Sequence, residues 1–126
     1  MSSQQLARLI AALADEKQAT DLVAFEVGDL VGYTDVLLIC TARNERLAKA
    51  IHDEVHARLK HEWELLPSRA EGLGENRWIL LDYGVCVVHI FVPETRERYR
   101  LEQLWGEAPE LELGLGAAPE AVRGPA

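Results

Sequence analysis

Apolar residues recur at helical spacing in two separate stretches of the chain. The first set is Leu6, Leu9, Ile10 and Leu13, and the second is Leu47, Ile51, Val55 and Leu59. Intervals of three and four residues place each set on one face of a helix. The pattern predicts helices over residues 4–17 and 44–62, and Asn44 is a suitable N-cap for the second.

Strand-like runs occupy much of the remaining chain, at residues 21–27, 35–41, 78–84 and 85–92. The run at 35–41 is apolar on both faces, which is typical of a strand inside a sheet covered by helices. The last two runs fold back at Asp82-Tyr83-Gly84 and predict an antiparallel hairpin. A short strand within 65–70 would lie at a sheet edge, because Pro67 lacks an N–H. We expect an α/β fold with a mixed sheet of about five strands.

The end of the chain predicts a third helix and then a tail. Pro93 ends the last strand, and Thr95 can cap a helix. The residues expected to dock this helix on the sheet are Tyr99, Leu101, Leu104 and Trp105. The periodicity stops there, so residues 1–105 are predicted to form one domain. Residues 106–126 are rich in Gly, Ala, Pro and Glu and predict a disordered acidic tail.

Composition and charge exclude several classes of protein. The 126 residues fit one globular domain, and a net charge of −8 disfavours binding to nucleic acid through phosphates. An acidic surface suits a basic protein partner. No apolar run approaches the roughly 18 residues of a membrane span, and no cleavable leader is evident, so we expect a cytoplasmic protein. Cys40 and Cys86 both lie in apolar runs and offer no disulfide framework.

The histidines offer weak candidates for chemistry. His52 and His56 have the spacing of a helical zinc motif, but Asp53 stands where the catalytic Glu belongs and no third ligand is apparent. A solvent-facing pair is the favoured interpretation, and no metal is expected. His89 lies inside a strand, where a core histidine with a satisfied hydrogen bond is favoured over a catalytic one.

A nucleotide-processing enzyme is a fairer alternative, since nucleotidyl transferases share a small mixed sheet with flanking helices. These enzymes need paired carboxylates to hold divalent metal. Asp35 and Asp82 each stand alone, and no phosphate-binding Gly-rich loop with Lys occurs. Three classes stay open: an interaction protein, a nucleotide- or small-molecule-binding module, and an enzyme using a histidine.

Several short motifs occur in a recognisable order. In the C-terminal half they are WILLDYG at 78–84, VVHIF at 87–91, Arg96, Tyr99 and LEQLW at 101–105. In the N-terminal half they are Thr34-Asp35, ICT at 39–41, Arg46, Ala50-Ile51 and Glu71-Gly72. Over residues 4–107 the chain resembles the ribosomal silencing factor family, also called Iojap. It departs from the usual family pattern at Val36-Leu37, residues 44–47, Val85 and Arg98.

The resemblance implies a translational repressor without enzymatic activity or cofactor. Family members bind the large ribosomal subunit through ribosomal protein L-fourteen and block joining of the small subunit, and organellar members assist large-subunit assembly. The implied fold is similar to that of nucleotidyl transferases without their catalytic carboxylates. Self-association into a homodimer is a further expectation, because an apolar partner-binding face can pair with itself when the partner is absent.

Such a mechanism requires a competing surface with aromatic anchors. Alternation along a strand places Trp78, Leu80 and Asp82 on one face, which we expect to meet the partner. We expect Tyr83 to join them at the turn and Glu71 to offer negative charge to a basic ribosomal protein.

Overall fold

A five-stranded mixed sheet organises the protein in this computed structural model, which describes residues 1–115. The strands, in their order across the sheet, are β1 (Thr20–Glu26), β2 (Val36–Thr41), β5 (Cys86–Phe91), β4 (Trp78–Asp82) and β3 (Arg69–Glu71). β2 and β5 are parallel, whereas the other neighbouring pairs are antiparallel. The predicted α/β class, the interior position of β2 and the β4–β5 hairpin are therefore confirmed.

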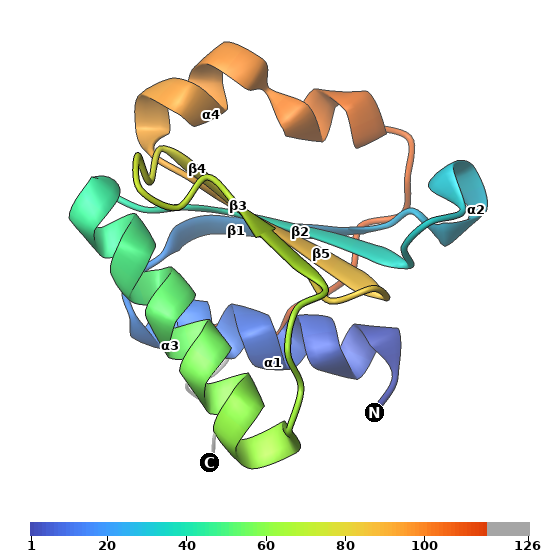
Figure 1. The fold of residues 1–126 in the computed structure, drawn as a ribbon. Helices are drawn as coiled ribbons and strands as arrows, with labels where there is room; N and C mark the ends of the chain where they lie inside the picture. Colours follow the sequence, from blue (N-terminus) through green and yellow to red (C-terminus); the bar gives the residue numbers. More distant parts are fainter. Residues whose placement is uncertain (116–126) are drawn as a thin grey trace, which may run out of the picture.

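Two long helices, α1 (Ser3–Glu16) and α3 (Glu45–Trp63), cover one face of the sheet (Figure 1). Each begins where a side chain can accept a hydrogen bond from an unpaired backbone N–H. Ser2 caps α1 in a capping box with Gln5, and the Asn44 side chain accepts from the Leu47 N–H at 2.9 Å. Both helices match the predicted ranges to within one residue at each end.

The larger core lies between these helices and the sheet. Its fully buried members include Ile10 from α1, Ile51 from α3, Leu38 from β2 and Ile90 from β5. All six residues of β2 and all six of β5 are buried. These two strands therefore form the buried centre of the sheet, and β1 and β4 pair with them on either side.

A second, smaller core fills the opposite face of the sheet, beneath α4 (Pro93–Tyr99) and the 3₁₀ helix η1 (Leu101–Trp105). The predicted cap at Thr95 is wrong: α4 begins at Pro93, whose missing N–H costs nothing in the first helical turn. Arg100 has a φ of 46° and separates the two helices. Leu101 and Trp105 pack on the sheet as expected, but Leu104 is exposed.

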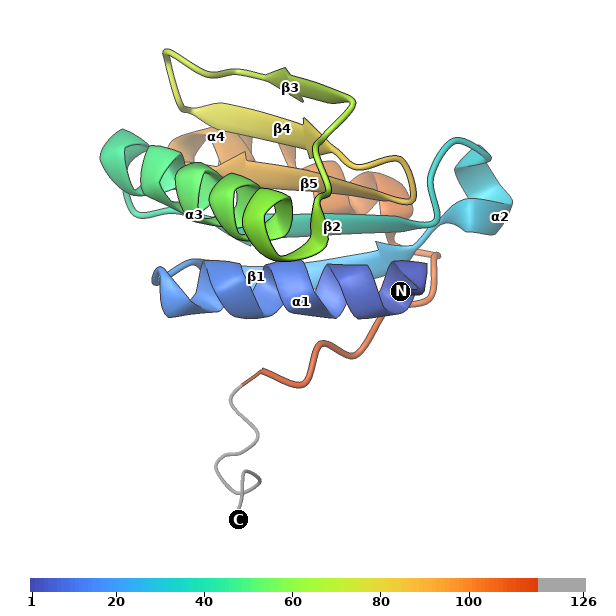
Figure 2. The ribbon, with the colours of Figure 1, turned by 60° about the horizontal axis from the view of Figure 1, so that its bottom comes forward.

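Part of the predicted tail packs against the domain, so the boundary at residue 105 is too early. The Leu111 N–H donates to the Ala24 carbonyl at 2.8 Å, and the Glu26 N–H donates to the Pro109 carbonyl at 2.8 Å. The segment thus covers the outer edge of β1 beside α1 (Figure 2). Ala108 and Leu111 are buried. The rest of the predicted tail, residues 116–126, lies outside the described residues.

Two short elements complete the described part. The predicted edge strand within 65–70 is β3, which begins at Arg69, four residues after the start of that range. One helical turn that the pattern did not predict, α2 (Gly28–Val31), follows β1. No helix within residues 1–115 has the length and apolar character needed to cross a membrane.

Candidate partner-binding face

One side of the β3–β4 pair carries the residues singled out for partner binding. Trp78, Leu80 and Asp82 are partly exposed and alternate with buried Ile79 and Leu81. β3 adds to the same side, because Glu71 pairs with Leu80 and Arg69 pairs with Asp82. We call Arg69, Glu71, Trp78, Leu80 and Asp82 the hairpin face. The expected side-by-side placement of Glu71 with Trp78, Leu80 and Asp82 is thus seen in the structure.

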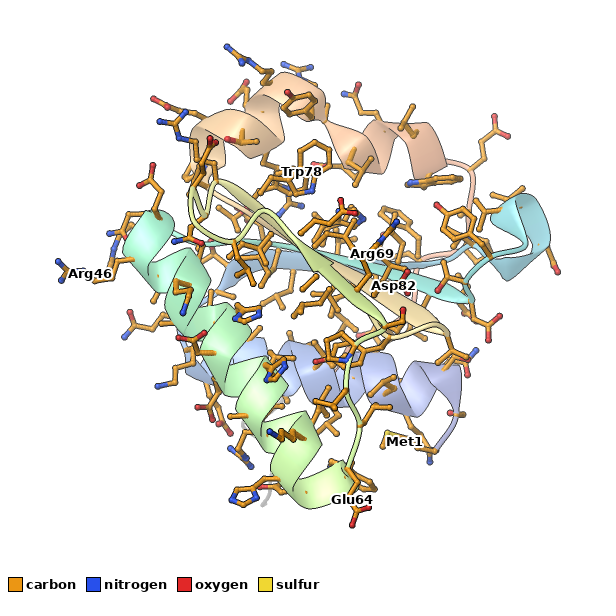
Figure 3. All side chains as sticks on the ribbon, in the orientation of Figure 1. Met1, Arg46, Glu64, Arg69, Trp78 and Asp82 are labelled. Atoms are coloured by element: carbon orange, nitrogen blue, oxygen red, sulfur yellow. The ribbon has the colours of Figure 1, made fainter. Side chains whose placement is uncertain are left out.

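Trp78 is the aromatic centre of this face, but it is also part of the second core. Its ring centroid lies 4.8 Å from that of Phe91 and 4.8 Å from that of Tyr99 on α4. Its Nε1–H donates a hydrogen bond of 2.9 Å to Nδ1 of His89. Figure 3 shows Trp78 close beneath α4. Trp78 therefore holds α4 on the sheet, and the polar end of the ring faces inward.

The charges of the face are arranged within the sheet. The Arg69 Nε lies 3.2 Å from a Glu71 carboxylate oxygen, and Arg69 Nη2 lies 4.0 Å from Asp82 (Figure 3). Asp82 also accepts a 2.8 Å hydrogen bond from the Gly84 N–H and so closes the β4–β5 turn. Exposed ion pairs of this kind contribute little stability. Glu71 consequently remains available to an incoming cation at small cost.

Tyr83 does not belong to this face, and its expected role is wrong. Only 7% of the residue is exposed, and it packs with Ile79 and Leu81 in the core beneath α1 and α3. The same period of two that groups Trp78, Leu80 and Asp82 sends Tyr83 to the opposite side of the sheet. Burial also raises the pKa of Tyr83 to about 12. Tyr83 and the hairpin face thus lie on opposite sides of the sheet.

His89 is a core residue with a satisfied hydrogen bond, as the sequence predicted. It is buried beside Trp78, whose indole N–H it accepts through Nδ1. Burial lowers the pKa of His89 to about 4, so the ring is neutral at physiological pH. A protonated ring would carry a hydrogen on Nδ1 and lose its acceptor for Trp78.

Acid should therefore destabilise the protein through His89. Between pH 6.5 and about 4 the unfolded chain binds a proton at this site and the folded chain does not, so the free energy of unfolding falls as pH falls. The loss is on the order of 3 kcal/mol across that window. Urea denaturation of the wild type and His89→Asn, whose amide oxygen can still accept from Trp78, measures it. If both proteins lose the same stability between pH 7 and 4.5, the assignment to His89 is wrong.

The remaining candidates for chemistry are accounted for structurally. The rings of His52 and His56 stack with centroids 5.6 Å apart, and His52 is buried, so a fully solvent-facing pair is wrong. Within residues 1–115 no group of three His, Cys, Asp or Glu side chains is arranged to hold a metal. Burial raises the pKa of Cys40 and of Cys86 to about 12, which leaves both thiols unreactive.

Comparison with known proteins identifies the family of this chain. The model of the family described as "Ribosomal silencing factor during starvation" matches residues 1–125. The chain belongs to the ribosomal silencing factor family. It is 37% identical over 113 residues to the ribosomal silencing factor of Halalkalibacterium halodurans, covering 90% of this chain and 96% of the relative. The family is thus named for regulation of the ribosome.

Two further relatives extend the comparison. A crystal structure of a Chromobacterium violaceum protein has a TM-score of 0.80 and 27% identity, covering 84% of this chain and 88% of that one. The mouse protein named "Mitochondrial assembly of ribosomal large subunit protein 1" is 31% identical over 103 residues, covering 77% of this chain and 43% of the relative. This ribosomal silencing factor family member thus matches less than half of the length of the mouse protein.

Two residues of this ribosomal silencing factor family member have structural roles that the sequence did not predict. Arg96 on α4 is 13% exposed and donates to the Asp21 carbonyl at 2.7 Å and to Thr41 Oγ1 at 2.8 Å. Gly72 turns the chain from β3 towards β4 with a φ of 86°. Both residues belong to the quoted family motifs. Only their position beside apolar strands hinted at a structural role in the sequence.

Proposed function

We propose that this chain represses translation in the cytoplasm by binding ribosomal protein L-fourteen on the large ribosomal subunit. Its presence there obstructs joining of the small subunit, and the same contact supports assembly of the large subunit. The observation that supports the proposal is the hairpin face: a partly exposed apolar and charged strip that the fold holds rigidly and that contains no catalytic group.

The size and character of the face suit such a contact. Steric repression needs only a surface of about 800 Å² per partner, with a few apolar anchors surrounded by polar groups. Leu80 supplies a partly exposed apolar side chain at the centre of the strip. Val85, 43% exposed at the β4–β5 turn, extends the apolar surface beyond Asp82.

The charge of the chain favours a protein partner over ribosomal RNA. A net charge of −8 opposes direct binding to phosphates, and we expect no nucleic-acid contact to carry the affinity. Glu71 is exposed at the rim of the face and is positioned to pair with a lysine or arginine of a basic ribosomal protein. Such pairs chiefly accelerate association and fix orientation.

Co-sedimentation of the full chain with purified large subunits tests the proposal directly. We expect saturable binding to large subunits and none to small subunits. Leu80→Asp, which places a charge in the middle of the face, should weaken binding at least 30-fold, equivalent to about 2 kcal/mol. The matched control is Leu66→Asp, since Leu66 is 55% exposed on the loop after α3. It should bind like the wild type.

Other outcomes separate the parts of the proposal. Absence of the chain from the large-subunit pellet contradicts the function as a whole. Equal loss in the two aspartate variants contradicts the assignment of the face. Trp78→Ala is expected to cost about 2 kcal/mol of binding, but its result counts only if its urea denaturation shows a folded protein, because Trp78 also packs on Phe91 and Tyr99.

The free edge of β3, which borders the hairpin face, can associate with a second copy when the ribosome is absent. Its alternating Arg69 and Glu71 flank Ala70, so antiparallel pairing about Ala70 would bring opposite charges together. Sedimentation equilibrium of the free chain tests this homodimer. L-fourteen should dissociate it if both contacts use the hairpin face.

A further inference from the structure

A second potential site lies at the other end of the central strands, away from the β4–β5 turn. A cavity of about 690 Å³ opens beyond the carboxyl ends of the parallel strands β2 and β5, next to the start of β1 and under the junction of α4 with η1. Ligands of α/β proteins commonly bind beyond the carboxyl ends of parallel strands. A volume of several hundred cubic ångströms is typical of small-molecule sites. We call this space the strand-end cavity.

Arg96 lines the strand-end cavity, and hydrogen bonds hold its guanidinium in place. Nη1 of Arg96 donates to the Asp21 carbonyl and to Thr41 Oγ1, and its Nε donates to Glu102 at 3.3 Å. These bonds occupy Nε and Nη1 and fix the plane of the guanidinium. Within residues 1–115, Nη2 of Arg96 has no hydrogen-bond partner. A preorganised guanidinium with two spare N–H donors favours a carboxylate.

The wall of the cavity holds groups whose hydrogen-bonding capacity is unused. Oε1 of Glu102 is buried and lacks a hydrogen-bond partner among the described residues, although Oε2 of the same carboxylate bonds Arg96. A buried oxygen without a donor is costly and calls for an explanation. Arg43 and Asp21 also line the cavity, and neither side chain is paired within residues 1–115. The Arg43 guanidinium and the Asp21 carboxylate, both on exposed residues, therefore remain open to a ligand, whereas Oε1 of Glu102 is closed to solvent.

The backbone around the cavity is held in uncommon conformations. Gln18, Asp21 and Arg100 have φ values of 69°, 50° and 46°, and all three line it. They are three of the five non-glycine residues with positive φ in the described part of the chain. β1 also carries an irregularity between Thr20 and Val23. Such conformations persist where the surroundings impose them, and they concentrate at binding sites.

The charges around the cavity narrow the class of ligand. The cations are Arg43, Arg96 and Arg100, and the anions are Asp21, Glu97 and Glu102. A phosphate would be repelled by the carboxylates, and a polyamine would be repelled by Arg43 and Arg96. A ligand that carries one positive and one negative group can pair with both the cations and the anions of the cavity.

We propose that the strand-end cavity binds a zwitterionic α-amino acid. Its carboxylate accepts from Arg43 and from Nη2 of Arg96, while its ammonium group donates to the Asp21 carboxylate. This site is separate from the hairpin face, so the inference stands or falls independently of ribosome binding.

Titration of the ¹⁵N-labelled full chain with glycine, L-glutamine and L-leucine, followed by amide chemical shifts, tests the proposal. These amino acids have neutral side chains of different size, so any shared response reports on the two charged groups. We expect saturable shifts at Asp21, Thr41 and Glu102 with at least one of them, at a Kd of about 1 mM or below. Its N-acetylated and its α-amide derivatives, which each lose one charge, should bind at least 10-fold more weakly.

A matched pair of arginine variants locates the carboxylate contact. Arg43→Gln removes a cation from the cavity and should weaken binding of the same amino acid at least 10-fold. Arg46→Gln removes a cation on α3 that does not line the cavity (Figure 3), and it should leave binding unchanged. Equal effects of the two substitutions contradict the proposed contact.

Three further results would overturn the proposal. One is the absence of saturable shifts with all three amino acids. Another is equal affinity for the N-acetylated derivative, which would remove any role for the ammonium group. The third is saturable binding of inorganic phosphate or spermidine at these amides without amino-acid binding, which would define a site for a singly signed ion.

Discussion

Gly72→Ala is expected to disrupt the β3–β4 pair and to be the most destabilising single-methyl change in the described part of the chain. An added Cβ at this position would overlap the carbonyl oxygen of Trp78 and lie 2.9 Å from its carbonyl carbon. The backbone of β4 cannot move away, because β4 is paired along its whole length with buried β5. β3 would have to separate instead, and Glu71 would leave the hairpin face. We expect a loss of about 4 kcal/mol or more in the free energy of unfolding.

Gly84→Ala is the matched control for this prediction. Gly84 has a φ of 85°, almost the same as the 86° of Gly72, but no atom lies within 4 Å of the position of its added Cβ. In the Gly84→Ala variant the free energy of unfolding should fall by only about 1 kcal/mol, which is the cost of a left-handed backbone conformation for alanine. Urea denaturation followed by tryptophan fluorescence gives both values. Similar losses in the two variants would show that the close approach to Trp78 is not what requires glycine.

The long elements could be predicted because their signals are local. Helices α1 and α3 and strands β2, β4 and β5 each carry a regular apolar pattern that tertiary packing only reinforces. The side of the sheet on which Trp78, Leu80 and Asp82 lie also follows from the sequence, since alternation alone determines it. The error at Tyr83 came from treating it as a turn residue, whereas the alternation that starts at Ile79 continues through Leu81 to Tyr83.

The segment after Trp105 has the composition of a disordered tail but the apolar pattern of an extended, packed segment. Gly, Ala, Pro and Glu are typical of disorder, yet Leu111, Leu113 and Leu115 alternate with polar or small residues. That period of two is the signal of an extended segment with one buried side. All three leucines pack against the larger core. What the sequence alone does not reveal is that the edge of β1 is free to receive them.

The strand-end cavity could not be predicted from spacing, because its residues come from distant parts of the chain. Asp21, Thr41 and Glu102 are brought together only by the order of the strands and by the break between α4 and η1. The break is set at Arg100 by a positive φ that no glycine marks. Local propensity therefore had no means of indicating this site.

Arg96→Met is expected to be the second most costly change, because Arg96 ties α4 to the ends of β1 and β2. The substitution removes hydrogen bonds to the Asp21 carbonyl, to Thr41 Oγ1 and to Glu102. It also leaves the partly buried Glu102 carboxylate without its cation. Removing one partner of a buried ion pair typically costs 3–5 kcal/mol. Because Arg96 is 13% exposed, we expect a loss of about 3 kcal/mol in the free energy of unfolding.

Arg100→Met provides the comparison, four residues further along the same segment. The Arg100 side chain is 56% exposed, and its ion pair with Glu97 spans 3.4 Å at the surface. Its loss should cost less than about 1 kcal/mol.

The double variant Arg96→Met, Glu102→Gln should recover part of the stability lost in Arg96→Met, because it no longer buries an unpaired carboxylate. If the double variant is no more stable than Arg96→Met, the main contribution of Arg96 is its pair of bonds to Asp21 and Thr41. In that case α4 is fixed to the sheet by hydrogen bonds to β1 and β2 and not by its ion pair with η1.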